Sequence, residues 1–226
     1  MAGRLRVVAT PIGNLEDLSA RARQALASAD LVACEDTRRT GLLLHHLGIK
    51  KPLLSLHDHN ERLRLPRVLD ALASGQTVAL VSDAGTPLVS DPGFLVVREA
   101  AKLGIAIEPI PGPSAVLTAL VASALPPAPF TFAGFPPPKS GKRRTFYRAL
   151  AALDHTLVFF ESPHRLLPSL EDAQAEFGDR PAALCRELTK LHEETVRGSL
   201  SELRTGFAAR PSIKGEFVLV VGGATS

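Results

Sequence analysis

The chain has 226 residues, of which 45% are hydrophobic and 22% are charged, a composition typical of a globular protein with a substantial core. The formal net charge of +3 permits a polyanionic partner without requiring one. Only two cysteines are present, both in apolar runs, so we expect no disulfide framework and a reducing, cytoplasmic location. Prolines interrupt the uncharged segment 109–138, which therefore predicts a buried helix rather than a membrane span.

Short apolar runs alternate with helical patterns through the first half of the chain. The apolar runs predict strands at Leu5–Ala9, Leu31–Cys34, Leu53–Leu56, Val78–Val81 and Ile105–Ile110. The segments between them predict helices at about Leu18–Ser28, Arg38–Leu47, Pro66–Ser74, Phe94–Leu103 and Ser114–Leu125. This alternation favours an α/β fold with a doubly wound, mainly parallel sheet.

A proline-rich segment, Pro126–Pro129, cannot continue the preceding helix and favours extended backbone. We interpret it as a linker between two α/β domains, residues 1–125 and 126–226. Strand-like runs resume after it at Phe130–Ala133, Thr156–Phe160, Ala182–Cys185, Val196–Leu200 and Phe217–Val221. Helical stretches separate these runs, so the second domain is also predicted to be α/β.

Four loops of the first domain would leave the same edge of a parallel sheet, namely residues 10–14, 35–38, 82–92 and 111–115. They are rich in glycine, proline and short polar residues. In the third loop, Ala84 and Gly85 place almost no side chain between the backbone and a ligand. Ligands of open α/β sheets bind outside the carboxyl ends of the strands. The sequence therefore predicts a binding site at this edge, closed by the second domain.

Several familiar sites are excluded by their spacing. No Gly-x-Gly-x-x-Gly follows the first predicted strand, which excludes the dinucleotide-binding fingerprint. The segment 134–142 resembles a phosphate loop, but its glycines are too far apart and its prolines lack amide donors. His57 and His59 lack the further ligands that a zinc site needs, so we predict no metal.

Two groups of basic residues have alternative interpretations. Arg38 begins a predicted helix, where a positive charge opposes the helix dipole. Either the preceding acids neutralise it, or Arg38 faces a bound phosphate or carboxylate. A second run between Pro136 and Leu153 contains no acid, which is typical of either a solvated helix face or a nucleic-acid phosphate contact. The candidate RNA contacts in this second run are Lys139, Lys142, Arg143 and Arg144.

Nine short motifs occur in a characteristic order along nearly the whole chain. They are Pro11–Leu15, Glu35–Arg38, Leu56–Glu61, Ser82–Pro87, Asp91–Gly93, Pro111–Pro113, Phe160–Arg165, Arg186–Lys190 and Lys214–Glu216. Each motif is weak alone, but the combination is specific. It resembles the ribosomal RNA small subunit methyltransferase I family, within the tetrapyrrole-methylase superfamily.

The resemblance implies S-adenosylmethionine as cofactor, bound between the two domains, and a homodimer. It also implies 2′-O-methylation of a decoding-site cytidine in bacterial 16S ribosomal RNA, within the small ribosomal subunit. Matched by motif, the cofactor-lining residues of the first domain would be Pro11, Asp83, Gly85, Thr86, Leu88, Val89, Ser114 and Ala115. Those of the second would be Glu161, Leu188 and Gly215.

Methyl transfer to a ribose hydroxyl requires a base, because a sugar hydroxyl is a poor nucleophile. The candidates are Glu35, Asp36, His57 and Lys190. We favour Asp36, which follows the second strand at the edge with the cofactor loops, although a helix N-cap would explain it equally well.

Two other functions remain open from the sequence. A precorrin-type small-molecule methyltransferase would share the fold and cofactor but would not need the basic run. A non-catalytic RNA-binding protein would keep that run without needing the glycine- and proline-rich loops.

Overall fold

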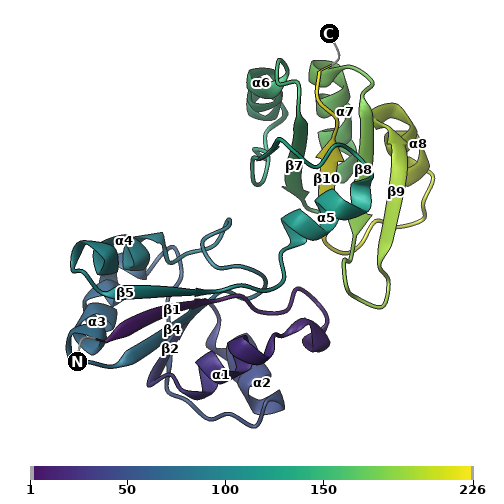
Figure 1. The fold of residues 1–226 in the computed structure, drawn as a ribbon. Helices are drawn as coiled ribbons and strands as arrows, with labels where there is room; N and C mark the ends of the chain where they lie inside the picture. The colour runs from purple at the N-terminus through teal and green to yellow at the C-terminus, as the bar shows by residue number, and fades with distance from the viewer. Residues whose placement is uncertain (1–2, 225–226) are drawn as a thin grey trace. The chain divides into compact units, whose positions relative to one another are not determined.

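A computed structural model describes residues 3–224. The chain divides into two compact units, Met1–Ser114 and Ala115–Ser226, each built around one five-stranded sheet (Figure 1). The predicted α/β class and the doubly wound first sheet are confirmed. No helix in the described part of the chain is long and apolar enough to span a bilayer.

The first sheet is entirely parallel, with strand order β3-β2-β4-β1-β5. Its strands are β1 (Arg4–Val8), β2 (Leu31–Cys34), β3 (Leu53–Ser55), β4 (Thr77–Val81) and β5 (Ala106–Ile110). The central strands are near-continuous apolar runs because helices cover both faces of the sheet. All strand ends that precede the predicted loops therefore lie at one edge.

The helices of this unit divide between the two faces. They are α1 (Ala20–Ala27), α2 (Thr37–His46), α3 (Glu61–Ala73) and α4 (Phe94–Lys102), with a short 3-10 helix η1 (Leu15–Asp17) after β1. Apolar residues of α1 and α2 form one cluster with the sheet, and those of α3 and α4 form another with its opposite face. The carboxyl edge is thus open between two helical layers.

Helix α3 begins at Glu61, several residues before the predicted start at Pro66, and Pro66 lies inside it. Glu61 is buried, and its Oε1 accepts hydrogen bonds from the backbone N–H groups of Gly93 and Leu95, at 3.1 and 2.9 Å. These two N–H groups lie at the start of α4, where the helix itself offers them no acceptor. A carboxylate from a neighbouring helix therefore caps α4 and fixes where the loop after β4 ends.

The second sheet is mixed, with strand order β6-β7-β10-β8-β9. Its strands are β6 (Phe130–Phe132), β7 (Thr156–Glu161), β8 (Pro181–Arg186), β9 (Glu194–Ser199) and β10 (Phe217–Val221). Strands β6 and β7 are parallel, whereas β10 runs antiparallel between β7 and β8. One face packs on the remaining helices, α6 (Ser140–Leu150), α7 (Leu166–Phe177) and α8 (Leu200–Ala208).

Helix α5 (Ala115–Ser123) covers the other face of the second sheet. The Cys185 thiol of β8 lies 3.8 Å from the Ala119 carbonyl oxygen, to which it donates. The expected boundary at residue 125 is therefore wrong, because the apolar α5 packs with the second unit. The proline-rich Pro126–Pro129 segment lies inside that unit, where the Pro126 carbonyl accepts a 2.6 Å hydrogen bond from the Thr156 hydroxyl.

Candidate active site

The loops at the carboxyl edge of the first sheet are joined by direct contacts. Thr10 and Gly85 exchange two backbone hydrogen bonds of 2.9 and 3.0 Å, which tie the loop after β1 to the loop after β4. The Thr86 hydroxyl donates to the Pro113 carbonyl at 3.3 Å, which adds the loop after β5. Three of the four predicted loops therefore form one assembly, which contains Pro11 and ends at Ser114.

The loop after β4 has an unusual backbone. Gly85 adopts a φ of +78°, and the non-glycine residues Leu88 and Ser90 adopt +75° and +68°. A positive φ costs energy for residues with a Cβ, and such residues cluster at ligand-binding sites. Val89 and Ser90 are exposed, whereas the Leu88 side chain packs against the core of the first unit.

The fourth loop lines an open cavity of 460 Å³ at the same edge. Its walls come from the ends of three adjacent strands: Glu35 and Asp36 after β2, Ser55 and His57 at β3, and Asp83 after β4. The Asp83 carboxylate accepts a 3.0 Å hydrogen bond from the Asp36 backbone N–H and lies 3.4 Å from the Arg39 guanidinium. Three of the four predicted base candidates, Glu35, Asp36 and His57, therefore line the same cavity.

Asp36 and Glu35 have opposite electrostatic environments. Hydrogen bonds from the Arg38 side chain and backbone N–H hold the pKa of Asp36 well below its ordinary value. Asp36 is also the N-cap of α2. Burial, followed by the carboxylates of Asp83 and Asp58, raises the pKa of Glu35. Of the two, Glu35 is the better proton acceptor, which counts against our preference for Asp36.

Asp91 belongs to the same acidic cluster, although it was not among the residues predicted to form the site. Burial raises its pKa to about 6, and the carboxylates of Glu35, Asp83 and Asp58 act in the same direction. Carboxyl groups that are desolvated beside like charges are common at functional sites. The signal in the sequence was the Asp91-Pro92-Gly93 motif, which is easily taken for a helix cap because proline follows the acid.

The predicted residues of the second unit gather at one edge of its sheet. Glu161 ends β7 opposite Phe217 of β10, and Phe217 also faces Arg186 at the end of β8. Glu161 is buried, and its Oε1 accepts a 2.8 Å hydrogen bond from the Ser162 backbone N–H. Gly215 precedes β10 with a φ of +104°. Ala115 lies elsewhere in this unit, as the first residue of α5.

The segment after β8 is the second strained region. Glu187 and Thr189 have φ values of +49° and +65°, and Leu188 between them is buried. A Cβ added at Gly215 would lie 2.6 Å from Cγ of Glu187, so only glycine fits there. The Thr189 Oγ1 atom is buried without a hydrogen-bond partner among the described residues, which marks it as a further polar group at this edge.

Lys190 is poorly suited to act as a base. Its Nζ lies 3.0 Å from a carboxylate oxygen of Glu187 and 3.0 Å from one of Glu216. Although burial lowers the pKa of Lys190, these two hydrogen-bonded carboxylates raise it overall. The side chain is therefore held as a cation, and its ion pairs stabilise the segment that contains Leu188.

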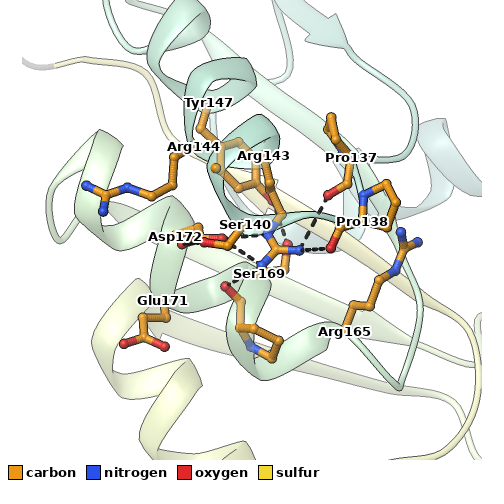
Figure 2. A network of polar contacts seen from close by, with 12 residues as sticks. Pro137, Pro138, Ser140, Arg143, Arg144, Tyr147, Arg165, Ser169, Glu171 and Asp172 are labelled. Carbon is orange, nitrogen blue, oxygen red and sulfur yellow. Dashed lines mark hydrogen bonds and ion pairs between the residues drawn. The ribbon is translucent and has the colours of Figure 1, made fainter.

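The basic run of α6 divides into buried and exposed members. Arg143 is 2% exposed, and its Nη2 lies 2.6 Å from Oδ2 of Asp172 on α7. Figure 2 shows the same guanidinium donating to the carbonyls of Pro137 and Pro138. The prediction that Arg143 contacts RNA is therefore wrong, since its donors are used inside the protein.

Arg144 is exposed but shares Glu176 of α7 with Arg148, at 2.7 and 2.8 Å. Lys139 and Lys142 are exposed, and the described part of the chain offers them no ion pair. These two lysines are the members of the run that are available to a polyanion.

Within residues 3–224, no group of three His, Cys, Asp or Glu side chains is placed to hold a metal ion.

Comparison with known proteins identifies the family. Residues 4–204 match the family model described as Tetrapyrrole (Corrin/Porphyrin) Methylases. A protein of Mesorhizobium japonicum named ribosomal RNA small subunit methyltransferase I is 53% identical over 97% of this chain and 75% of its own length. The protein of the same name from Mycobacterium bovis is 50% identical, covering 99% of this chain and 79% of its own length.

A solved structure extends the comparison to three dimensions. Uroporphyrin-III-C-methyltransferase from Thermus thermophilus is 26% identical, with a TM-score of 0.66 over 97% of this chain and 94% of the other. Sequence and fold agree, and the chain belongs to the family of tetrapyrrole methylases.

Proposed function

We propose that this protein is an S-adenosylmethionine-dependent methyltransferase that methylates a ribose 2′-hydroxyl of a decoding-site cytidine in 16S ribosomal RNA. The observation that carries the substrate class is the degree of identity. Relatives about half identical over nearly the whole chain are named for ribosomal RNA, whereas the porphyrin enzyme is 26% identical. The small ribosomal subunit as substrate, a homodimer and a cytoplasmic location belong to the same proposal.

The residues at the carboxyl edge of the first sheet fit a cationic cofactor that must be approached closely by backbone. Ala84 and Gly85 have little or no side chain, and the positive φ of Gly85 turns the loop back onto Thr10. Asp83 and Asp91 of this loop interact electrostatically with Glu35, and the three carboxyl groups favour a cationic ligand. We assign the predicted residues Pro11, Asp83, Gly85, Thr86, Leu88, Val89 and Ser114 to cofactor binding, with Ala115, Glu161, Leu188 and Gly215 from the second unit.

Bound S-adenosylmethionine would supply an electrophilic methyl group on its sulfonium. On transfer, the ribose oxygen would gain this methyl group as the sulfur–methyl bond breaks, and the hydroxyl proton would need an acceptor. We assign its acceptor as Glu35, whose pKa is raised by burial and neighbouring carboxylates. Glu35 shares the cavity with Arg38, whose exposed guanidinium is suited to an RNA phosphate.

The direct test offers radiolabelled S-adenosylmethionine and the protein to three acceptors in parallel: isolated small subunits, free 16S ribosomal RNA and a precorrin. We expect label in RNA and none in the tetrapyrrole. Label in the precorrin alone would favour the small-molecule methyltransferase. RNA binding with no transfer to any acceptor would favour a non-catalytic RNA-binding protein.

A matched pair of variants tests the cofactor loop by calorimetry. Gly85→Val forces a branched side chain to adopt a φ of +78° at 3.4 Å from Cγ2 of Ile12. Gly104→Val imposes a similar φ of +68° in the turn between α4 and β5, where a Cβ meets nothing within 4 Å. We expect calorimetric cofactor binding to be lost in the first variant and kept in the second. Equal binding by both would place the cofactor elsewhere.

A further inference from the structure

His57 lies in the cavity wall beside Glu35 and Asp83, and its contacts define which of its nitrogens carries the proton. The Oδ1 atom of Asn60 accepts a 2.9 Å hydrogen bond from the His57 backbone N–H. The Nδ2 atom of Asn60 lies 3.3 Å from the Ser55 carbonyl and 2.9 Å from Nε2 of His57. A backbone donor on one side and a backbone acceptor on the other leave one orientation for the Asn60 amide.

The amide nitrogen of Asn60 has two hydrogens and cannot accept. One hydrogen is directed to Ser55, so the other meets Nε2 of His57. Nε2 must therefore accept, and in a neutral imidazole the proton then resides on Nδ1. No described residue accepts a hydrogen bond from Nδ1 of His57, although acceptors are abundant in this cavity.

We propose that Asn60 is a positioning residue that fixes His57 in the Nδ1–H tautomer, so that His57 donates a hydrogen bond to a ribose or phosphate oxygen of the RNA. His57 is then excluded as the base, because its accepting nitrogen is already used by Asn60. The identity of the ligand rests on the proposed function, whereas the assignment of the His57 tautomer does not. Proton removal stays with Glu35.

The tautomer is measured directly by long-range proton–nitrogen NMR of uniformly labelled protein, above the pH range in which histidines ordinarily titrate. His57→Asn identifies the His57 signals by their loss. In the wild-type protein we expect the proton on Nδ1, and a proton on Nε2 would overturn the proposal. In Asn60→Asp an oxygen replaces the donor facing Nε2, so we expect the proton to move to Nε2. The exposed His45 and His46 serve as internal controls, since their signals should not change.

Two substitutions at His57 separate a donor from a base. An asparagine amide places a donor close to the Nδ1 position, whereas a glutamine amide reaches the Nε2 position. We expect His57→Gln to raise the KM for RNA by about 10- to 100-fold relative to His57→Asn, as for a lost hydrogen bond to a charged or polar oxygen.

If both variants instead lose single-turnover rate by about 100-fold or more with KM unchanged, His57 is a base and the proposal is wrong. The two levels of failure are distinguishable. A wild-type protein that transfers no methyl group to RNA contradicts the proposed function and the RNA oxygen as ligand. The nitrogen spectrum still decides whether Asn60 fixes His57 as a donor.

Discussion

Two adjacent carboxylates, Glu35 and Asp36, differ because of what lies next to each. Arg38 donates to Asp36 and keeps its carboxylate charged, whereas burial and two acidic neighbours disfavour charge on Glu35. A carboxylate stabilised by an arginine is a weak base, and one that is desolvated is a stronger one. The division of roles follows from these contacts alone.

Substitution of each carboxylate by its amide tests this division. We predict that Glu35→Gln lowers the single-turnover methylation rate by about 100-fold or more, while cofactor and RNA remain bound. Asp36→Asn should keep a nearly normal rate, since asparagine also caps helices well. Single-turnover kinetics at saturating ligands measure both, with thermal melts to confirm folding. A near-normal rate for Glu35→Gln would remove it as the base.

The pKa of Asp91 predicts a pH dependence of stability. The folded state raises this pKa to about 6 from the ordinary 3.8, mainly through burial, so it holds the proton more tightly than the unfolded chain. The resulting stabilisation is complete below about pH 4 and is lost as the pH rises through about 6. At neutral pH a buried charge remains, which lowers the free energy of unfolding.

Asp91→Asn is neutral at every pH and should therefore gain stability over wild type as the pH rises. We predict equal stability near pH 4 and a gain of about 1–2 kcal/mol near pH 7, allowing for solvent screening of a partly exposed group. The exposed Asp70→Asn on α3 is the control and should show no such trend. Urea unfolding at the two pH values decides, and parallel curves for wild type and Asp91→Asn would contradict the raised pKa.

The base could not be chosen from the sequence, since all four candidates have suitable chemistry. What separates them is spatial: Lys190 is held between Glu187 and Glu216, and Nε2 of His57 is engaged by Asn60. Glu216 lies far along the chain from Lys190 and reaches it only because β10 inserts beside β8. A pattern of residue types contains no information on such contacts.

At the scale of elements, the α6–α7 pair shows how a basic run can be misleading. The run has no acid nearby in the sequence, but Asp172 and Glu176 of α7 lie against it and pair with three of its arginines. Figure 2 shows Arg143 between the two helices, with Ser140 also donating to Asp172 at 2.9 Å. This guanidinium stabilises the helix pair and the preceding proline loop.

The buried and exposed members of the run should therefore respond differently to substitution. We predict that the double variant Lys139→Ala with Lys142→Ala has a shallower slope of log binding constant against log salt concentration. On single-stranded RNA the slope should fall by up to about 0.7 for each lost phosphate contact, and stability should not change. The control is Lys50→Ala with Lys102→Ala, two cations outside the run, which should keep the slope. Filter binding across a salt series measures both, and an unchanged slope would exclude α6 as an RNA surface.

Arg143→Ala is expected to destabilise the protein by about 3–5 kcal/mol, because it leaves the Asp172 carboxylate buried without its partner. Arg143→Ala with Asp172→Ala should recover part of that loss, since neither charge is then stranded. Chemical denaturation measures the free energy of unfolding of the wild-type protein and of both variants. A loss below about 1 kcal/mol for the single variant would contradict the structural role.

The positions of strands and helices were largely predictable, but not how they assemble. Hydrophobic runs located the strands to within a residue or two, as in β2 and β10, because burial on both faces requires such runs. The apolar composition of α5 indicated burial without indicating against which sheet. Its assignment to the second unit depends on long-range contacts, as does the insertion of β10 between β7 and β8.

In the molecule as a whole, each unit places several residues of positive φ at one edge of its own sheet. In the first unit these include Gly85, Leu88 and Ser90, and in the second Glu187, Thr189 and Gly215. Each edge also carries a carboxyl group that is at least partly buried, Asp91 in the first and Glu161 in the second. Strain of this kind persists only where the surrounding structure holds it, and it is typical of binding sites.

Methyl transfer to a cytidine ribose of small-subunit ribosomal RNA is tested by the chemical position of the methyl group in the product. Isolated small subunits are incubated with the protein and S-adenosylmethionine that carries a deuterated methyl group. The RNA is then digested to nucleosides for mass spectrometry. We expect the label on the ribose of cytidine, and no label with Gly85→Val. Label on a base, on another nucleoside, or absent from the RNA would contradict it.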